Sequence, residues 1–527
     1  MFEFLAAAID PNIKHHLSVI TFLPLVGAVF LAFINRKRER ELKATAFFFS
    51  LITFVASLPV LFDFNVGTGF DKRLMETADW IPAFGIQYKM GVDGISLFLV
   101  MLTTFLSPII MLSSSTNVHH KVKEFFIAML VLETGLIGSF CALDLFLFYV
   151  FFELMLIPMY LLIGVWGSDE NARRAAAIKF FVYTLLGSLL MFLAVLYIAG
   201  VAKTFDIERL PAECQKLPMG AQYLCFGAFM LSFAIKTPVF PFHTWLPHAH
   251  TEAPTGGSVI LAGVMLKLGT YGMLRFAIPF FPVVAFDLAP LMMILAVIGI
   301  IYGSMMCLAQ DDLKRLIAYS SVAHMGFIVL GLFSFNLIAT QGALIQNINH
   351  GLSTGLLFLL VGMLYERRHT RIFAEFGGIA KVMPKFAVLF MIATLASVGL
   401  PGTNGFVGEF LILLGTFGGS GVGPWTWTFS STMATFAATG VVLGAVYMLW
   451  AYQRVFFGEI TVKENLTLRD VNRTEMAFAV PVVVLIFFIG LSPNSILART
   501  EPAVQATLER ALTAVEAHKT ALTAAAK

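Results

Sequence analysis

Charged side chains are scarce in this sequence. Asp, Glu, Lys and Arg make up 13% of its 527 residues, and hydrophobic residues make up 58%. A soluble globular domain carries about 25% charged residues, so the composition excludes that class. Apolar runs of about 20 residues, the length that crosses a bilayer, recur from near the N-terminus almost to the C-terminus. They leave no window for a large soluble domain, and we predict an all-α polytopic membrane protein.

The sequence also lacks the motifs of several cofactor and nucleotide sites. It has no GxxxxGK[ST] phosphate-binding loop, and its four cysteines lie far apart without a CxxC pair, which argues against an iron-sulfur or structural zinc site. The net charge of +3 gives no reason to expect nucleic acid as a partner. The first residues, MFEFLAAAIDPNIKHH, show no cleavable signal pattern. We expect no cofactor or metal in this chain, and the bilayer and other membrane subunits as its partners.

The apolar runs predict about fourteen membrane-spanning helices. Proline and glycine interrupt the seventh and the twelfth, in the segments TPVFPF and LPGTNG, so we expect both helices to be discontinuous. The alanine-rich C-terminal tail predicts an amphipathic helix. The expected spans cover residues 17–34, 44–62, 92–112, 125–142, 145–165, 177–200, 221–242, 255–278, 288–308, 316–334, 341–364, 384–417, 433–457 and 476–491.

The distribution of positive charge predicts the orientation. Loops that follow odd-numbered spans carry more Lys and Arg than loops that follow even-numbered spans. Such loops face the cytoplasm by the positive-inside rule. We therefore expect both termini on the opposite, outer side of the membrane.

Two segments indicate an internal repeat. Residues 176–193 and 343–360 share a pattern of small residues and leucines, and each precedes an interrupted span. Repeats of five helices, an odd number, must be inverted relative to one another, and paired broken helices point to an ion pathway. We expect four parts: N-terminal helices in residues 1–124, a first five-helix repeat in 125–280, a second and inverted repeat in 281–457, and a last helix with the tail in 458–527.

Ionisable residues inside the spans are the strongest functional signal. A charged side chain at a lipid-exposed helix centre costs about 2.5–3.5 kcal/mol on insertion scales, so such residues face the bundle interior, water or one another. Proton movement through a membrane requires buried groups that gain and lose protons. The candidates are Glu133, Glu153, Lys236, Lys267, His324, His350 and Glu409.

A glutamate and a lysine that pair or separate can act as a proton switch. When Glu153 approaches Lys236, the lysine holds its proton; when Glu153 moves away, the proton can pass on, with Lys267 as the first candidate acceptor. Histidine suits relay positions because its unperturbed pKa is about 6.5. Backbone carbonyls freed at the two helix breaks would bind water beside Lys236 and Glu409.

Each of these residues also has a structural explanation. Lysines can reach toward an interface, Glu153 can serve only as an ion-pair partner, and His324 and His350 can be core histidines or interhelical contacts. Glu133 is the weakest functional candidate. The spacing of His243, His248 and His250 fits no zinc motif, and we expect loop hydrogen bonds there instead.

Four motifs resemble the antiporter-like membrane subunits of respiratory complex I, the type I NADH:quinone oxidoreductase. They are FFELMLIPMYLLIGVWG (151–167), KTPVFPFHTWLPHAHTEAPTGGSVILAGVMLKLGTYG (236–272), DDLKRLIAYSSVAHMGF (311–327) and GLPGTNGFVGEFLIL (399–413). The resemblance covers nearly the whole chain. It implies fourteen helices, inverted repeats at helices 4–8 and 9–13, and a row of charges along the membrane centre.

The resemblance also implies roles for particular residues. Glu153 matches the glutamate of the fifth helix, Lys236 its partner in the broken seventh, and Lys267 the central lysine of the eighth. His324 and His350 match relay positions, and Glu409 matches the terminal acid of the broken twelfth helix. Sister subunits typically carry lysine at that last position, and the short C-terminal tail differs from the L type. Both features favour the M type, the counterpart of mitochondrial subunit four. His248 stands where relatives often have an acid, and we attach no mechanism to it.

The resemblance implies a proton-translocating subunit driven by redox chemistry elsewhere in its complex. FMN, iron-sulfur clusters and quinone are expected in partner subunits, and L-type and N-type subunits among the neighbours. The length and the tail favour a bacterial cytoplasmic membrane over a mitochondrial inner membrane. Two rivals stay open: a subunit of a multi-subunit sodium/proton antiporter or membrane-bound hydrogenase, and a non-conducting scaffold.

Overall fold

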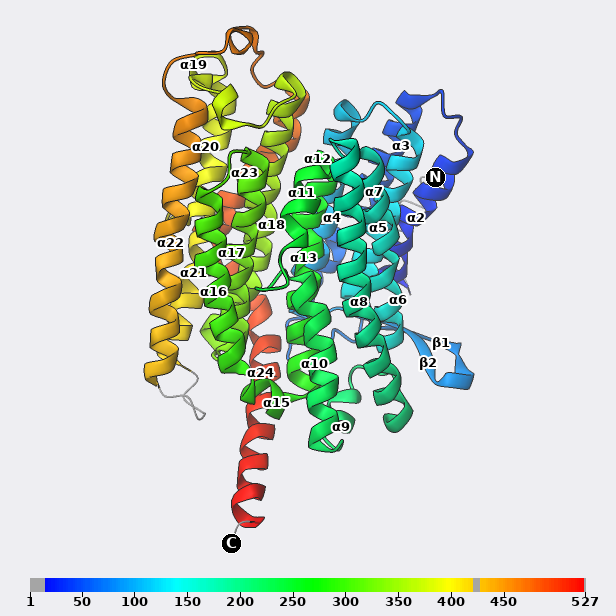
Figure 1. The fold of residues 1–527 in the computed structure, drawn as a ribbon. Coiled ribbons are helices and arrows are strands. Elements are labelled where there is room, and N and C mark those ends of the chain that lie inside the picture. Colours follow the sequence, from blue (N-terminus) through cyan, green and yellow to red (C-terminus); the bar gives the residue numbers. More distant parts are fainter. Residues whose placement is uncertain (1–14, 420–426, 526–527) are drawn as a thin grey trace.

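The computed structural model of this chain describes residues 15–419 and 427–525. Long helices lie side by side along a common direction in the described part (Figure 1), as expected for a polytopic membrane protein. Thirteen helices in that part are long and apolar enough to cross a membrane. The all-α prediction is therefore confirmed, while most of the N-terminal stretch examined for a signal pattern lies outside the described residues.

The spans begin and end within a few residues of the predicted positions in most cases. The third is an exception: it begins at Leu97, not at residue 92, because Asp93 and Ser96 cap the turn that precedes it. The spanning helices are α2 (His16–Phe33), α3 (Glu39–Phe62), α4 (Leu97–Asn117), α5 (Val122–Cys141), α6 with α7 (Leu145–Leu154, Leu156–Trp166), α8 (Glu170–Ala202), α10 (Met219–Lys236), α12 to α14 (Thr255–Ile260, Leu266–Gly272, Ile278–Phe280), α16 (Ala289–Leu308), α17 (Leu313–Phe333), α18 (Leu337–Arg368), α22 (Trp427–Phe456) and α23 (Arg473–Leu491).

Shorter helices complete the bundle. Helices α20 (Pro384–Val398) and α21 (Asn404–Gly418) are the two halves of the interrupted twelfth span, and α11 (Trp245–Glu252) follows the interruption after α10. Both predicted discontinuities are therefore present. The predicted tail helix is α24 (Asn494–Ala525), which extends beyond one end of the bundle in Figure 1. The other short helices are α9 (Leu210–Cys214), α15 (Pro282–Asp287) and α19 (Ile379–Val382).

A β-hairpin lies in the loop before α4, where we predicted no regular structure. Strands β1 (Glu76–Ile81) and β2 (Ile86–Met90) pair antiparallel, and Gly85 adopts a left-handed φ of 68° at the turn. The Glu76 carboxylate accepts a hydrogen bond of 2.5 Å from the Leu17 backbone N–H. That contact caps the first turn of α2 and fixes the hairpin to the bundle.

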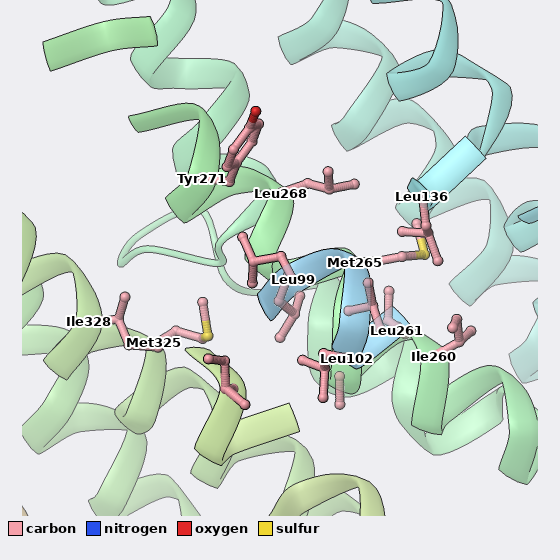
Figure 2. Close-up of a cluster of buried hydrophobic side chains, with 14 of the residues drawn as sticks. Leu99, Leu102, Leu136, Ile260, Leu261, Met265, Leu268, Tyr271, Met325 and Ile328 are labelled. Carbon is pink, nitrogen blue, oxygen red and sulfur yellow. The ribbon is translucent and has the colours of Figure 1, made fainter. Parts of the chain in front are cut away.

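Three spans form the centre of the bundle. Thr255–Phe280 and Leu313–Phe333 are 100% buried over their apolar stretches and Leu337–Arg368 is 94% buried, whereas Trp427–Phe456 and Arg473–Leu491 reach only 33%. Figure 2 shows apolar side chains of α4, α5, α17 and the Thr255–Phe280 span gathered around this centre. The outer helices therefore face lipid, and the central ones are shielded from it.

The Thr255–Phe280 span approaches α10 very closely. A Cβ atom on Gly269 would lie 2.0 Å from the Thr237 hydroxyl and 2.6 Å from the Phe233 carbonyl oxygen. Only glycine permits this contact. It brings the end of α10, where Lys236 lies, against the helix that carries Lys267.

Candidate functional site

Six of the candidate residues follow the middle of the bundle, and we call them the row. Five of these side chains are buried and Glu153 is half-buried. Each lies on a different helix, so the site is built by packing and not by one local segment. The row consists of Glu153 (α6), Lys236 (α10), Lys267 (α13), His350 (α18), His324 (α17) and Glu409 (α21).

Lys267 and His350 contact each other at the centre of the row. The lysine Nζ lies 2.7 Å from His350 Nδ1 and also donates to the Ala262 carbonyl oxygen. Ala262 belongs to a π-helical turn, Leu261–Met265, which places its carbonyl under the lysine. Such turns are rare and frequently occur at functional sites.

His324 and Glu409 form a second contact beside the first. His324 Nδ1 lies 2.7 Å from Glu409 Oε1, and its Nε2 lies 3.2 Å from the Ser397 hydroxyl. The imidazole rings of His324 and His350 have their centroids 5.7 Å apart. The two pairs therefore form one cluster that joins α13, α18, α17 and α21.

Glu153 and Lys236 lie near each other without forming an ion pair. The Lys236 ammonium lies over the Phe152 ring, 4.6 Å from its centroid, directly beside Glu153 in sequence. The two groups are close enough for their charges to interact. Within the described residues, no ion pair of 4.0 Å or less joins them. The structure thus has the two groups in the separated arrangement.

Two carbonyls near the helix break after α10 accept hydrogen bonds from within the protein. The Trp245 indole N–H donates to the Ile235 carbonyl oxygen at 2.9 Å, and the Val239 N–H donates to the Ala234 carbonyl oxygen at 2.9 Å. Those carbonyls already have partners. Each of these oxygens can still accept a second hydrogen bond, so water beside Lys236 can bind there.

Glu133 is not part of the row. It is buried in α5, where the Ser50 hydroxyl donates to its Oε1 at 3.3 Å, and its Oε2 has no partner among the described residues. No row residue contacts it among the hydrogen bonds and ion pairs of the described residues. The structure therefore places Glu133 apart from the six residues of the row.

His250 is a candidate that the sequence analysis did not assign. Its ring is fully buried and stacks on Phe358 at 4.7 Å, and neither ring nitrogen has a partner among the described residues. The available signal was the position of His250 in the short helix α11, just past the predicted end of the seventh span.

The other two histidines of this segment lie elsewhere. His243 packs against Phe240 and Tyr302, and His248 is exposed. Within residues 15–419 and 427–525, no group of three or more His, Cys, Asp or Glu side chains can hold a metal ion. The loop hydrogen bonds predicted for this segment are absent at His250, because neither of its ring nitrogens has a partner among the described residues.

A cavity of about 220 Å³ opens where α4, α17 and α18 meet their loops. Polar and charged side chains line part of it, among them Ser114, Lys314, Glu366 and Arg371. Lys314 is itself buried and donates to the Ala253 carbonyl oxygen at the end of α11. The cavity therefore reaches the same short helix that carries His250.

Comparisons with known proteins agree with this architecture. The family described as NADH:quinone oxidoreductase/Mrp antiporter, TM matches residues 142–437, and the family described as NADH-ubiquinone oxidoreductase chain 4, amino terminus matches residues 19–138. A Rhodobacter capsulatus protein named NADH-quinone oxidoreductase subunit M is 47% identical over 504 residues, which cover 93% of this chain and 95% of the relative. A Marchantia polymorpha protein named NADH-ubiquinone oxidoreductase chain 4 is 45% identical over 479 residues, which cover 91% and 94%.

Solved structures give the same result for the fold. A chain of respiratory complex I from Thermus thermophilus with bound NADH superimposes with a TM-score of 0.84 at 32% identity, over 94% of this chain and 99% of that chain. A chain of the Mrp complex from Dietzia superimposes with a TM-score of 0.78 at 19% identity, over 98% of this chain and 56% of that one. The second similarity concerns the fold alone.

Proposed function

This chain belongs to the antiporter-like membrane subunits of NADH:quinone oxidoreductase, in the branch named subunit M or chain 4, and from this premise we propose that it moves protons across the membrane along its row of buried residues. The observation that carries the proposal is the contact chain at the centre of the row. Lys267 touches His350, His324 touches Glu409, and the two imidazoles face each other.

The chemistry of a transfer follows from these contacts. The Lys267 ammonium donates to His350 Nδ1, so a proton can move onto that imidazole. His324 is the next group along the row, with its ring centroid 5.7 Å from that of His350, and it receives the proton from His350. Glu409 accepts it last, because its carboxylate lies 2.7 Å from His324 Nδ1.

Glu153 and Lys236 act as the gate of this pathway. An approaching carboxylate stabilises the charged lysine, and a separated one favours release of the proton toward Lys267. The separated geometry seen for the pair supports a gate in its releasing state. Lys236 is the last residue of α10, next to a discontinuity, where a small backbone change moves the ammonium.

The cavity beside Lys314 provides access to the row. Polar side chains in its lining suit water, and the buried His250, whose ring nitrogens both lack a partner among the described residues, lies on the short helix that ends at the cavity. The loops at this end are those that the positive-inside rule assigns to the cytoplasm. We place both termini on the periplasmic side on the same ground, in a bacterial cytoplasmic membrane.

The remaining parts of the proposal concern organisation and partners. Residues 125–280 and 281–457 form two inverted repeats, each with one broken helix. FMN, iron-sulfur clusters and quinone belong to partner subunits, this chain holds no cofactor of its own, and its neighbours include the L-type and N-type subunits. Coupling between subunits is then electrostatic or mechanical.

The rival functions make different predictions. A subunit of a sodium/proton antiporter would share this fold, as the similarity to the Mrp complex chain shows. The relatives at 42% to 47% identity, however, are named as subunit M or chain 4. A non-conducting scaffold predicts that the row can be altered without effect. Proton pumping by complexes with substitutions at Glu153 or Lys236 therefore distinguishes a non-conducting scaffold from a proton-conducting subunit.

The test replaces the two gate residues in the assembled complex. With Glu153→Gln or Lys236→Ala, we expect proton uptake into inverted membrane vesicles and coupled quinone reductase activity to fall at least tenfold, because each change removes a group that the gate needs to hold or release the proton. Lys179→Ala is the control, since Lys179 donates to the Thr244 carbonyl oxygen outside the row. Normal pumping by both gate variants contradicts the proposal.

A further inference from the structure

The Glu409 carboxylate has a second hydrogen-bond donor, which sequence reasoning did not single out. The side-chain amide of Gln346 in α18 donates to Glu409 Oε1 at 3.1 Å. That oxygen is the one that His324 Nδ1 approaches. Gln346 is buried and lies one helical turn from His350 on the same helix.

The amide of Gln346 is held in turn by a chain of asparagines. Asn349 Nδ2 donates to Gln346 Oε1 at 3.2 Å and to the Asn404 carbonyl oxygen at 2.7 Å. Asn404 Nδ2 donates back to the Asn349 carbonyl oxygen at 3.2 Å. Asn404 is the first residue of α21, at the break in the twelfth span. These hydrogen bonds therefore connect Glu409 to the break between α20 and α21.

Two glycines make space for the hydrogen-bonded side chains of Gln346, Asn349 and Asn404. A Cβ atom on Gly408 would lie 2.2 Å from Gln346 Oε1, and one on Gly342 would lie 2.7 Å from the Ile412 backbone nitrogen. Helices α18 and α21 thus approach along a seam of small residues, with Gln346 between them. The amide cannot turn away from Glu409 without opening this seam.

We propose that Gln346 is a positioning residue for proton transfer to Glu409, and that the Gln346–Asn349–Asn404 chain couples the state of this carboxyl to the break between α20 and α21. An amide N–H stabilises a carboxylate and loses that interaction when the oxygen it faces takes up a proton. Protonation of Glu409 therefore weakens the hydrogen bond that it accepts from the Gln346 amide. The resulting shift of that amide is transmitted through Asn349 to Asn404. The inference rests on the proposed role of Glu409 in the row.

Other titratable side chains near Glu409 also affect how proton pumping depends on pH. His324 of α17 and Tyr447 of α22 are the titratable groups that act on it, and His350 of α18 lies beyond His324. Helix α20 presents the Ser397 hydroxyl on this side. A carboxyl introduced at position 346 would face Glu409 directly.

Two substitutions test the proposal in the assembled complex. Gln346→Leu removes the donor, and we expect the pumping rate to fall about tenfold at every pH, the effect of one lost hydrogen bond to a charged group. Gln346→Glu keeps the shape, but two carboxyls that share a site cannot both ionise. That variant can donate to Glu409 only while position 346 holds a proton, so we expect near-normal pumping at acidic pH and about tenfold loss at alkaline pH.

Recovery of Gln346→Glu at acidic pH also shows that the variant complex is assembled and intact. Gln341→Glu is the matched control, since Gln341 lies on the same helix and its amide nitrogen has no partner among the described residues. The inference is overturned if Glu409→Gln is impaired and Gln346→Leu pumps at the wild-type rate. It is also overturned if Glu409→Gln is impaired and Gln346→Glu shows the wild-type pH profile. Wild-type pumping by Glu409→Gln itself instead overturns the role of Glu409 in the proposed function.

Discussion

His350 occupies the junction of the row. Its Nδ1 contacts the Lys267 ammonium, and its ring faces His324. Its Nε2 has no partner among the described residues, so that nitrogen is available to water. A histidine in this position can receive a proton at one nitrogen and release one from the other.

Replacement of His350 by leucine keeps the bulk and removes both nitrogens. We expect proton uptake by vesicles that contain the variant complex to fall at least tenfold, because Lys267 loses its acceptor and the route to His324 is broken. His243→Leu is the matched control, since His243 is a buried histidine that packs against aromatic rings outside the row. Equal pumping by the two variants would exclude His350 as a relay.

The sequence could identify the charged members of the row but not all of the neutral ones. A lysine or glutamate at membrane depth is costly and therefore conspicuous, as Lys267 and Glu409 were. A buried amide such as Gln346 costs less and resembles any interhelical contact. His250 was assigned to a loop for a different reason, because the break in the seventh span was predicted but the short helix α11 that follows it was not.

At the scale of elements, the hairpin is fixed to the bundle by charge. Lys89 of β2 donates to Asp206 at 2.9 Å and to Glu208 at 2.6 Å, in the loop that follows α8. Burial opposes the charged form of this lysine, but the hydrogen bonds to Glu208 and Asp206 outweigh it and raise the pKa of Lys89 above its ordinary value. The ion pairs therefore hold the hairpin over the neighbouring loop.

Lys89→Met is expected to lower the stability of the assembled subunit by about 1–3 kcal/mol, less than for a fully buried pair because Glu208 is half exposed. A group with a raised pKa contributes stability that is complete below its unfolded pKa, about 10.4 for lysine, and is lost as the pH rises through the folded value. The difference between wild type and variant should therefore stay constant through neutral pH and shrink only under strongly alkaline conditions.

Thermal unfolding of the purified complex, followed at several pH values, measures this difference. Lys72→Met is the control, since Lys72 lies in the same loop and is exposed. A Lys89→Met variant as stable as Lys72→Met would show that the ion pairs do not hold the hairpin.

Long elements were predictable and short ones were not. A run of about 20 apolar residues leaves a helix as the only way to satisfy its backbone in lipid, so the spans follow from the sequence. The strands Glu76–Ile81 and Ile86–Met90 are too short and too polar to stand out, and the contacts that fix them come from α2 and the loop after α8. The positions of the two helix breaks were signalled by TPVFPF and LPGTNG.

At the scale of the whole molecule, helices distant in sequence surround one polar path. The central spans carry Lys267, His324 and His350 away from lipid, the broken helices carry Lys236 and Glu409, and α6 carries Glu153 at the end beyond Lys236. A bundle of this kind shields charges that a single helix could not carry. The central claim is that protons pass through Lys267 in the middle.

Proton uptake by inverted vesicles that contain assembled Lys267→Met complex tests this claim most directly. The account predicts that NADH-driven uptake is lost or falls at least tenfold, while Lys179→Met, altered at a lysine outside the row, pumps normally. Assembly is checked by native electrophoresis of the same membranes. Normal proton uptake by the Lys267→Met complex would contradict the account.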